Sequence, residues 1–350
     1  MKTDNKGFAP NISSAFTGNR GFVIRTLIAL FLLTGCEKAD VYTSDPQTNF
    51  DALWRIIDEH YCFFEYKDVD WNDVYGKYSV QLSDTMNKYA LFDMLGDMLG
   101  ELKDGHTNLI SSFDISRYWE WYENFPRNFN EDVHSKYIRG CRIAGGVEYQ
   151  RLADGKVGYM YYGSFSSSVS EAGLNEIFMY FKDCKGLIID VRDNGGGSLS
   201  NSDRIASRFL EKDMVVGYIM HKTGPGHNDF SAPYPIELKV SEYTTWLRPV
   251  VVLTNRHSYS ATNDFVSKMH SLSQVTVMGD RTGGGSGLPF NSELPNGWRI
   301  RFSASPMLDA GRQSTEDGID PDINVKMLPE DIENGKDTLI ETAILFLLKK

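Results

Sequence analysis

One serine stands where a folded chain could use it as a nucleophile. Ser260 separates an apolar run, Pro249–Leu253, from an amphipathic stretch that starts at Ala261, so the pattern predicts a strand-to-helix turn at this serine. The first N–H groups of a helix and its positive dipole end stabilise an anion. The N–H of Ala261 would therefore lie beside the oxyanion of a tetrahedral intermediate formed on Ser260. The alternative is an ordinary N-cap, in which the serine oxygen accepts a hydrogen bond from a following N–H.

A serine hydroxyl barely ionises at neutral pH and needs a base. His106 has the most suggestive setting of the seven histidines, because it follows a helix-like stretch and Gly105 is a candidate helix C-cap. The alternative is an exposed histidine just beyond a helix end. A third group has to orient the base, and Glu316 is one candidate among 47 acidic residues.

A run of three glycines, Gly195–Gly197, follows the apolar run Gly186–Asp190. Glycine leaves the backbone N–H uncovered and permits positive φ, so a turn here could form an anion-binding nest and supply a second oxyanion donor. The alternative is a flexible loop without a binding role.

Other kinds of site have little support in the sequence. There is no P-loop, and the dinucleotide fingerprint fails because its third glycine would fall on Ser200. His221 and His227 share a loop, but two histidines without a third ligand are weak evidence for a metal. We therefore expect neither a cofactor nor a metal. The formal charge of −11 repels phosphate backbones, so we expect no nucleic-acid partner.

Hydrophobic periodicity divides the rest of the chain into a helical and an α/β part. Residues 49–103 carry apolar side chains at spacings of three and four, which predicts helices. From residue 156 on, short β-rich runs alternate with helix-like stretches, which favours an α/β layer fold. The expected strands are Val157–Tyr162, Gly186–Asp190, Met214–Met220, Pro249–Leu253, Val275–Met278 and Trp298–Phe302, and the expected helices are Glu171–Phe181, Asp203–Leu210, Ala261–Leu272 and Asp337–Leu348.

The first 36 residues have the order of a secretory signal. Arg20 and Arg25 precede the apolar run Thr26–Leu33, which is too short to span a bilayer. The end of this segment, Leu33–Cys36, resembles the lipobox of bacterial lipoproteins, in which the cysteine is acylated. We therefore expect a chain held by lipid at Cys36 in the bacterial cell envelope, on a periplasmic or outer-membrane face, with the membrane contacted through the anchor only. The alternative is a short buried helix with a chance cysteine.

Three further cysteines, Cys62, Cys141 and Cys184, are isolated from one another in the sequence. They could form at most one disulfide in an oxidising compartment. For each of them we expect a small buried hydrophobic residue.

Six segments, in this order, resemble the S41 peptidases, the family of C-terminal processing and tricorn-type serine proteases. Each motif is weak alone, but their order along the chain is specific to the family. The segments are Leu102–Thr107, Gly155–Met160, Gly186–Gly197, Val250–Phe265, Gly279–Gly285 and Glu316–Asp322.

The resemblance implies a ClpP/crotonase-like α/β core of β-β-α units and hydrolysis of a peptide or unfolded protein through an acyl-enzyme. Ser260 matches the nucleophile of the family, and His106 and Glu316 match the other two members of a tricorn-type Ser-His-Glu triad. Ala261 and Gly196, with Gly197 as neighbour, match the oxyanion hole.

The sequence departs from the C-terminal processing branch in two ways. That branch has a catalytic lysine about two dozen residues after the serine, where this chain has Gly285, and Lys268 lies two helical turns along the nucleophile's helix. A Ser–Lys dyad is therefore not expected. The gap between Thr107 and Lys156 is too short for a PDZ domain, so substrate selection should come from the cleft.

The aromatic segment Tyr118–Phe125 could supply that selection, with Trp119, Trp121 and Tyr122 as candidates, or it could pack between domains. We expect a signal at 1–36, a tether at 37–48, a helical domain at 49–108, a connecting segment at 109–155 and the catalytic core at 156–350. Two other functions stay open: a non-catalytic protein that binds a peptide or an apolar ligand on the same scaffold, and a hydrolase of esters.

Overall fold

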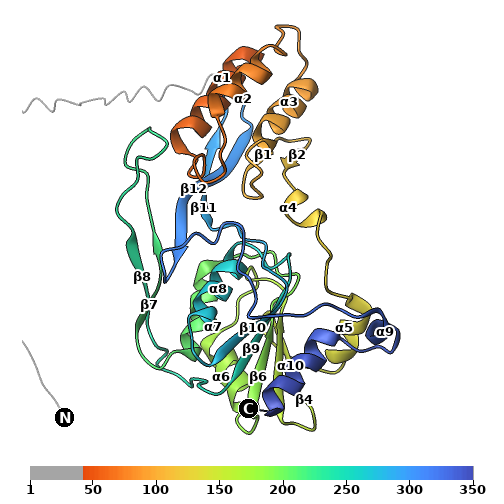
Figure 1. The fold of residues 1–350 in the computed structure, drawn as a ribbon. Helices are drawn as coiled ribbons and strands as arrows, with labels where there is room; N and C mark the ends of the chain where they lie inside the picture. The colour runs from red at the N-terminus through yellow and green to blue at the C-terminus, as the bar shows by residue number, and fades with distance from the viewer. Residues whose placement is uncertain (1–41, 350) are drawn as a thin grey trace, which may run out of the picture. The chain divides into compact units, whose positions relative to one another are not determined.

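The fold was analysed in a computed structural model that describes residues 42–349. Cys36, the expected signal and residues 37–41 of the expected tether lie outside the described residues. The described chain contains two sheets (Figure 1). The larger has the strand order β13-β10-β9-β6-β5-β4-β3, with parallel pairing from β5 to β13 and antiparallel pairing at β3 and β4. Its strands are β3 (Arg142–Ala144), β4 (Val147–Leu152), β5 (Val157–Tyr162), β6 (Gly186–Asp190), β9 (Val250–Thr254), β10 (Val275–Gly279) and β13 (Ile323–Asn324).

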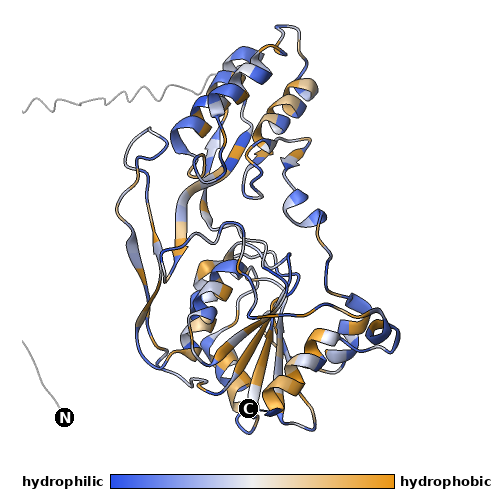
Figure 2. Ribbon diagram, in the orientation of Figure 1, coloured by the Kyte–Doolittle hydropathy of each residue, from blue (hydrophilic) through white to orange (hydrophobic). Residues whose placement is uncertain are grey.

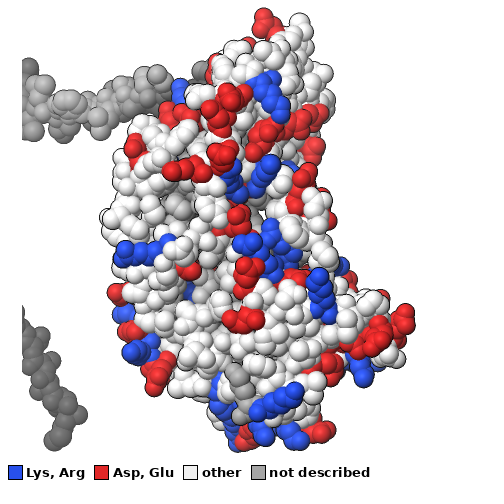
Figure 3. Space-filling view, viewed as in Figure 1, with Lys and Arg blue, Asp and Glu red and all other residues white. Residues whose placement is uncertain are grey.

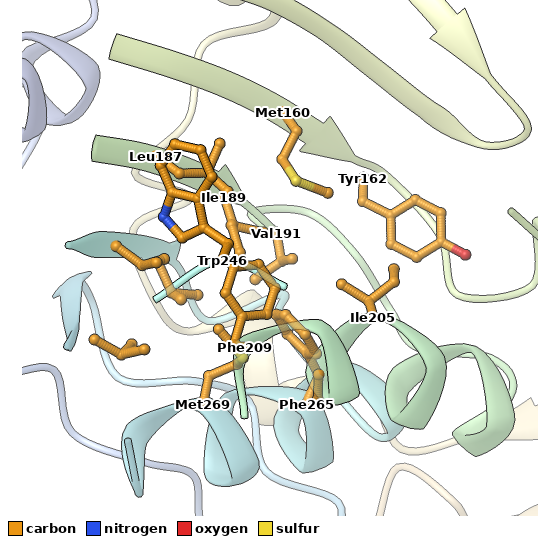
Figure 4. Close-up of a cluster of buried hydrophobic side chains, with 14 of the residues drawn as sticks. Met160, Tyr162, Leu187, Ile189, Val191, Ile205, Phe209, Trp246, Phe265 and Met269 are labelled. Atoms are coloured by element: carbon orange, nitrogen blue, oxygen red, sulfur yellow. The ribbon is translucent and has the colours of Figure 1, made fainter. Parts of the chain in front are cut away.

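Both faces of the central strands β5, β6, β9 and β10 are buried, which explains why these strands are mostly continuous apolar runs in the sequence. Leu187 and Ile189 of β6 point into one core with helices α6 (Glu171–Tyr180), α7 (Leu199–Ala206) and α8 (Ala261–His270). Ile188, between them, points into a second core against α10 (Thr338–Lys349). Figure 2 shows the strands and α10 as mostly hydrophobic. Figure 4 shows the first core, where Met160, Leu187 and Ile189 from the sheet lie near Ile205, Phe265 and Met269 from α7 and α8.

The second sheet has the order β2-β1-β12-β7-β8, and β11 also pairs with β12. Three N-terminal helices do not form a core by themselves, because their apolar side chains share one cluster with Ile300 and Phe302 of β12. The expected helical domain is therefore completed by a strand from the distant C-terminal part of the chain. The elements are α1 (Pro46–His60), α2 (Trp71–Ser79), α3 (Lys88–Gly100), β1 (Asn108–Ile110), β2 (Ile115–Arg117), β7 (Met214–Ile219), β8 (Tyr234–Leu238), β11 (Gly287–Glu293) and β12 (Arg299–Asp309).

The α/β fold expected from the sequence is confirmed. The bounds of the strand at Val157–Tyr162 agree with β5, whereas helix α7 begins at Leu199, four residues before the expected start at Asp203. The expected connecting segment at 109–155 contains most of β1, the strands β2, β3 and β4, and two short helices, α4 (Glu120–Glu123) and α5 (Glu131–Tyr137). The remaining short helices are the 3₁₀ turn Ser207–Phe209 and α9 (Pro329–Glu333).

Cys62, Cys141 and Cys184 are all free thiols, and Cys141 is only partly buried. Within residues 42–349, no helix has the length and apolar character needed to cross a bilayer. On the face shown in Figure 3, acidic and basic side chains are mixed, and acidic ones gather around α1–α3.

Candidate active site

Ser260 occupies the turn between strand β9 and helix α8, as the sequence predicts. It is the N-cap residue of α8, but its side chain makes no capping hydrogen bond. Its Oγ instead lies 2.8 Å from Nε2 of His106, a residue 154 positions away in the sequence. Its backbone has φ +59°, a strained conformation for a residue with a Cβ, which is typical of a nucleophile held on a sharp strand-to-helix turn.

Close backbone contacts hold this turn in place. The Ser260 N–H donates to the carbonyl of Gly284 at 2.9 Å, and the Ser258 hydroxyl donates to the carbonyl of Val191 at 2.8 Å. Gly196 passes so close that a Cβ there would lie 2.8 Å from Cβ of Ser260. Position 196 therefore needs a glycine, because the backbone there passes too close to the Ser260 turn for a side chain to fit.

His106 lies in the loop that follows α3, and it is 4% exposed. Its backbone N–H donates to Oδ1 of Asp104 at 2.8 Å, which fixes the loop as an Asx turn. Burial lowers the pKa of His106 to about 4, although the Asp104 charge opposes this effect. The imidazole is therefore neutral at pH 7, the form that accepts a proton from serine.

The prediction that Gly105 caps helix α3 is wrong. The helix ends at Gly100, and Lys103 is the residue with the left-handed backbone, at φ +48°. Gly105 is needed for a different reason: a Cβ there would lie 2.6 Å from Nε1 of Trp121 and 2.9 Å from the hydroxyl of Tyr259. Glycine lets the His106 loop pack against the aromatic segment and the nucleophile's turn.

Glu316 lies in the same buried region but does not hydrogen-bond to His106. Its Oε2 accepts the Ser286 N–H at 2.8 Å, and its Oε1 lies 3.2 Å from Nζ of Lys67. Among the residues that the structure describes, Nδ1 of His106 has no hydrogen-bond partner, and neither does Oδ2 of Asp104. The structure thus brings Ser260 and His106 together and places Glu316 beside them, held by a lysine and a backbone amide.

The glycine-rich segment 279–287 connects the serine turn to Glu316. Gly284 accepts the Ser260 N–H, and the next N–H, that of Gly285, donates to the Glu316 carbonyl at 3.0 Å. Gly284 has φ +81°, and a Cβ at this position would collide with the Glu316 carbonyl. These glycines bring Glu316 close to the nucleophile.

The oxyanion donors differ in part from the expectation. Gly196 donates its N–H to Oδ1 of Asn194 at 3.0 Å, so this donor is already engaged. In the described part of the chain, the N–H groups of Gly197 and Ala261 have no recorded acceptor, and both residues line one cavity with Ser260. The N–H groups of Gly197 and Ala261 are thus available at this cavity, whereas that of Gly196 is engaged and Gly196 shapes the turn.

This cavity has a volume of about 400 Å³ and is also lined by His106. Much of its wall is apolar and comes from strands β7, β8, β11 and β12. A hydrophobic wall beside a nucleophile can hold an apolar side chain next to the bond to be cleaved. The apolar lining residues from these strands are Val216, Ile236, Leu288, Pro289, Met307 and Leu308.

The aromatic segment lies on the other side of the serine turn. Trp121 stacks on Tyr259, with ring centroids 4.0 Å apart, and lines a separate cavity with Lys67 and Glu316. None of Trp119, Trp121 and Tyr122 lines the cavity at Ser260. Trp121 thus supports the turn that carries Ser260.

Lys268 is paired with carboxylates, and two further residues near Ser260 and His106 were not predicted from the sequence. Nζ of Lys268 lies 2.6 Å from Oδ1 of Asp203 and also contacts Asp264, so this lysine forms ion pairs with two carboxylates. The sequence reasoning missed Asp104 and Lys67. Asp104 could have been found, because it stands two residues before His106 in a turn-forming Asp-Gly pair, whereas Lys67 has no sequence signal.

Two protein-family models match parts of this chain. The model of the family described as "Peptidase family S41" matches residues 156–325, and the model described as "Tricorn protease C1 domain" matches residues 42–100. The tricorn protease of Thermoplasma acidophilum is 29% identical over 72% of this chain, and the carboxy-terminal processing protease CtpA of Bacillus subtilis is 23% identical over 51%. The chain spans only 20% of the first relative and 37% of the second.

Solved structures give the same result. A crystal structure of a candidate peptidase from Parabacteroides merdae has a TM-score of 0.85 and 64% identity, covering 87% of this chain and 98% of that one. Mature CPAF complexed with lactacystin has a TM-score of 0.65 over 87% of this chain and 99% of that one, and at 11% identity it shows the fold alone. The family, the order of the motifs and the fold agree, and this chain belongs to peptidase family S41.

Proposed function

We propose that this protein is a serine peptidase that cleaves peptide bonds through an acyl-enzyme. One observation carries the proposal. Ser260 lies at the N-terminus of α8, and its Oγ is 2.8 Å from Nε2 of His106, which is buried and neutral. A hydroxyl that only capped the helix would bond to a following N–H, and this one does not.

In the proposed reaction, Ser260 Oγ attacks the carbonyl carbon of the substrate and His106 takes the hydroxyl proton. The oxyanion that forms accepts hydrogen bonds from the N–H groups of Ala261 and Gly197. His106 then gives its proton to the leaving amine, the C–N bond breaks, and water hydrolyses the ester on Ser260 by the same steps. Such a base contributes about 10²–10⁴ in rate, and each oxyanion donor about 3–4 kcal/mol.

Glu316 is the proposed acidic member of the triad. A carboxylate near the base stabilises the imidazolium that forms when serine gives up its proton. Glu316 and Asp104 are 5% and 1% exposed, so little water screens their charges. We infer that both carboxylates contribute through their charges, and that Asp104 also holds the loop of His106 by accepting its backbone N–H.

The proposed substrate is a peptide or an unfolded protein with an apolar side chain next to the scissile bond. The test is incubation with a reduced, alkylated polypeptide, followed by mass spectrometry of new chain ends. We expect new ends that follow apolar residues preferentially. If the polypeptide stays intact but binds, the second candidate, a non-catalytic binding protein, is favoured. If only small esters are hydrolysed, the third candidate, a hydrolase of esters, is favoured.

The lipid anchor at Cys36 is also a proposal, and it rests on the sequence alone. A lipidated chain should fractionate with membranes, whereas the Cys36→Ser variant should appear in the aqueous fraction. Equal partitioning of the two chains between membrane and aqueous fractions would rule out the anchor.

A further inference from the structure

Lys67 joins three segments that meet at the active site. It lies in the turn after α1, and its side chain is 13% exposed. Its Nζ pairs with Oε1 of Glu316 at 3.2 Å and donates to the backbone carbonyl of Lys103 at 3.2 Å. Lys103 precedes His106 by three residues, so one ammonium group contacts both the loop of the base and the carboxylate of the proposed acid.

The charges around this ammonium group explain why a lysine is needed. Asp104 and Glu316 are both buried, and a buried carboxylate without a positive partner is costly. Among the ion pairs of residues 42–349, Lys67 is the cation recorded for Glu316, and none is recorded for Asp104. Lys67 is therefore the ion-pair partner of Glu316, and its charge also acts on Asp104, as does the charge of Arg301.

We propose that Lys67 is a positioning residue of the active site, which ties the Glu316 carboxylate to the loop of His106 and keeps that carboxylate charged. This inference rests on the proposed function. It makes the N-terminal helical segment a part of the catalytic apparatus, because the cation comes from there. The ionised carboxylate then stabilises the imidazolium in the transition state.

The other titratable groups around Glu316 come from several segments. Burial and the neighbouring Asp104 raise the pKa of Glu316 to about 7, against the opposing effects of Lys67 and the Ser286 N–H. Burial raises the pKa of Tyr61, Cys62 and Tyr259 well above their ordinary values, so these three stay neutral near pH 7. Asp317 is a further charge that acts on Lys67. The titratable groups that interact electrostatically with Glu316 are Tyr61, Cys62, Tyr66, Lys67, Asp104 and Tyr259.

The test is the pH dependence of kcat/KM in Lys67→Met. Loss of the positive charge should raise the pKa of Glu316 further, so the acidic limb of the profile should move from near pH 7 to higher pH by about 1–3 units. Activity at pH 7 should fall by about fivefold or more and should recover at alkaline pH. A loss of packing alone would lower activity at every pH and leave the limb in place.

Matched variants make the test specific. Lys67→Arg keeps the charge and should keep the limb near pH 7, and so should Lys103→Met, which removes an exposed lysine that lines the same cavity. In a Glu316→Gln background the limb near pH 7 should be absent, and adding Lys67→Met should leave the pH profile of that variant unchanged. If Lys67→Met does not fold, Lys67→Gln, which keeps a donor for the Lys103 carbonyl, takes its place.

An unchanged limb in a folded Lys67→Met or Lys67→Gln enzyme overturns the inference, and so does a shift that persists without Glu316. Failure of the proposed function looks different, because the parent protein itself would then not cleave peptides.

Discussion

Replacing Ser260 with alanine should abolish hydrolysis of an unfolded polypeptide, with kcat reduced by about 10⁶-fold. Alanine lacks the oxygen that forms the acyl-enzyme, so no other group can complete the reaction at this turn. It keeps the Cβ that packs against Gly196, and the Ser260 N–H bond to Gly284 does not involve the side chain. The fold should therefore survive, which circular dichroism and thermal melting can check.

Ser267→Ala is the matched control, because this serine lines the same cavity from the same helix. It should retain activity within a fewfold of the parent. A Ser260→Ala variant that cleaves as fast as the parent would show that another residue is the nucleophile.

Replacing His106 with glutamine should lower kcat by about 10⁴–10⁶-fold. Glutamine can still form a hydrogen bond to Ser260, but it cannot take a proton, so the hydroxyl loses its base. The imidazole has a pKa of about 4 because it is buried, so it is already neutral across the physiological range. The parent enzyme should consequently show no limb from His106 above about pH 5, and we expect a limb near pH 7 from Glu316.

His257→Gln is the control for this prediction. His257 lies on the same loop as Ser260, and its ring contacts Tyr122. The hydrogen bond recorded for Ser260 Oγ is with His106, not with His257. Its replacement should change kcat only slightly. Comparable losses in the two histidine variants would contradict the assignment of His106 as the base.

The sequence predicted the supports of the site better than its contacts. Strand β9 and helix α8 could be predicted because buried parallel strands are continuous apolar runs and an amphipathic helix has its own period. Those two elements place Ser260 at a turn by chain connectivity alone. His106 could be placed after a helix, and only the family's motif order linked it to a serine 154 residues away.

The direction of the Glu316 side chain could not be predicted. It depends on Lys67, which is remote in the sequence, and on the backbone amide of Ser286. Gly196 was assigned as an oxyanion donor from motif position, but the Asn194 side chain engages its N–H, a contact between near neighbours that periodicity does not encode. Side-chain competition for donors and acceptors decides such details after the backbone is in place.

The central claim is that Ser260 attacks the substrate and carries the acyl group. The most direct measurement is to treat the folded protein with a fluorophosphonate, digest it, and locate the adduct by mass spectrometry. Our account predicts one adduct, on the oxygen of Ser260, and its loss when His106 is replaced by glutamine. An adduct on a different residue, or a protein that hydrolyses peptides while Ser260 stays unmodified, would contradict it.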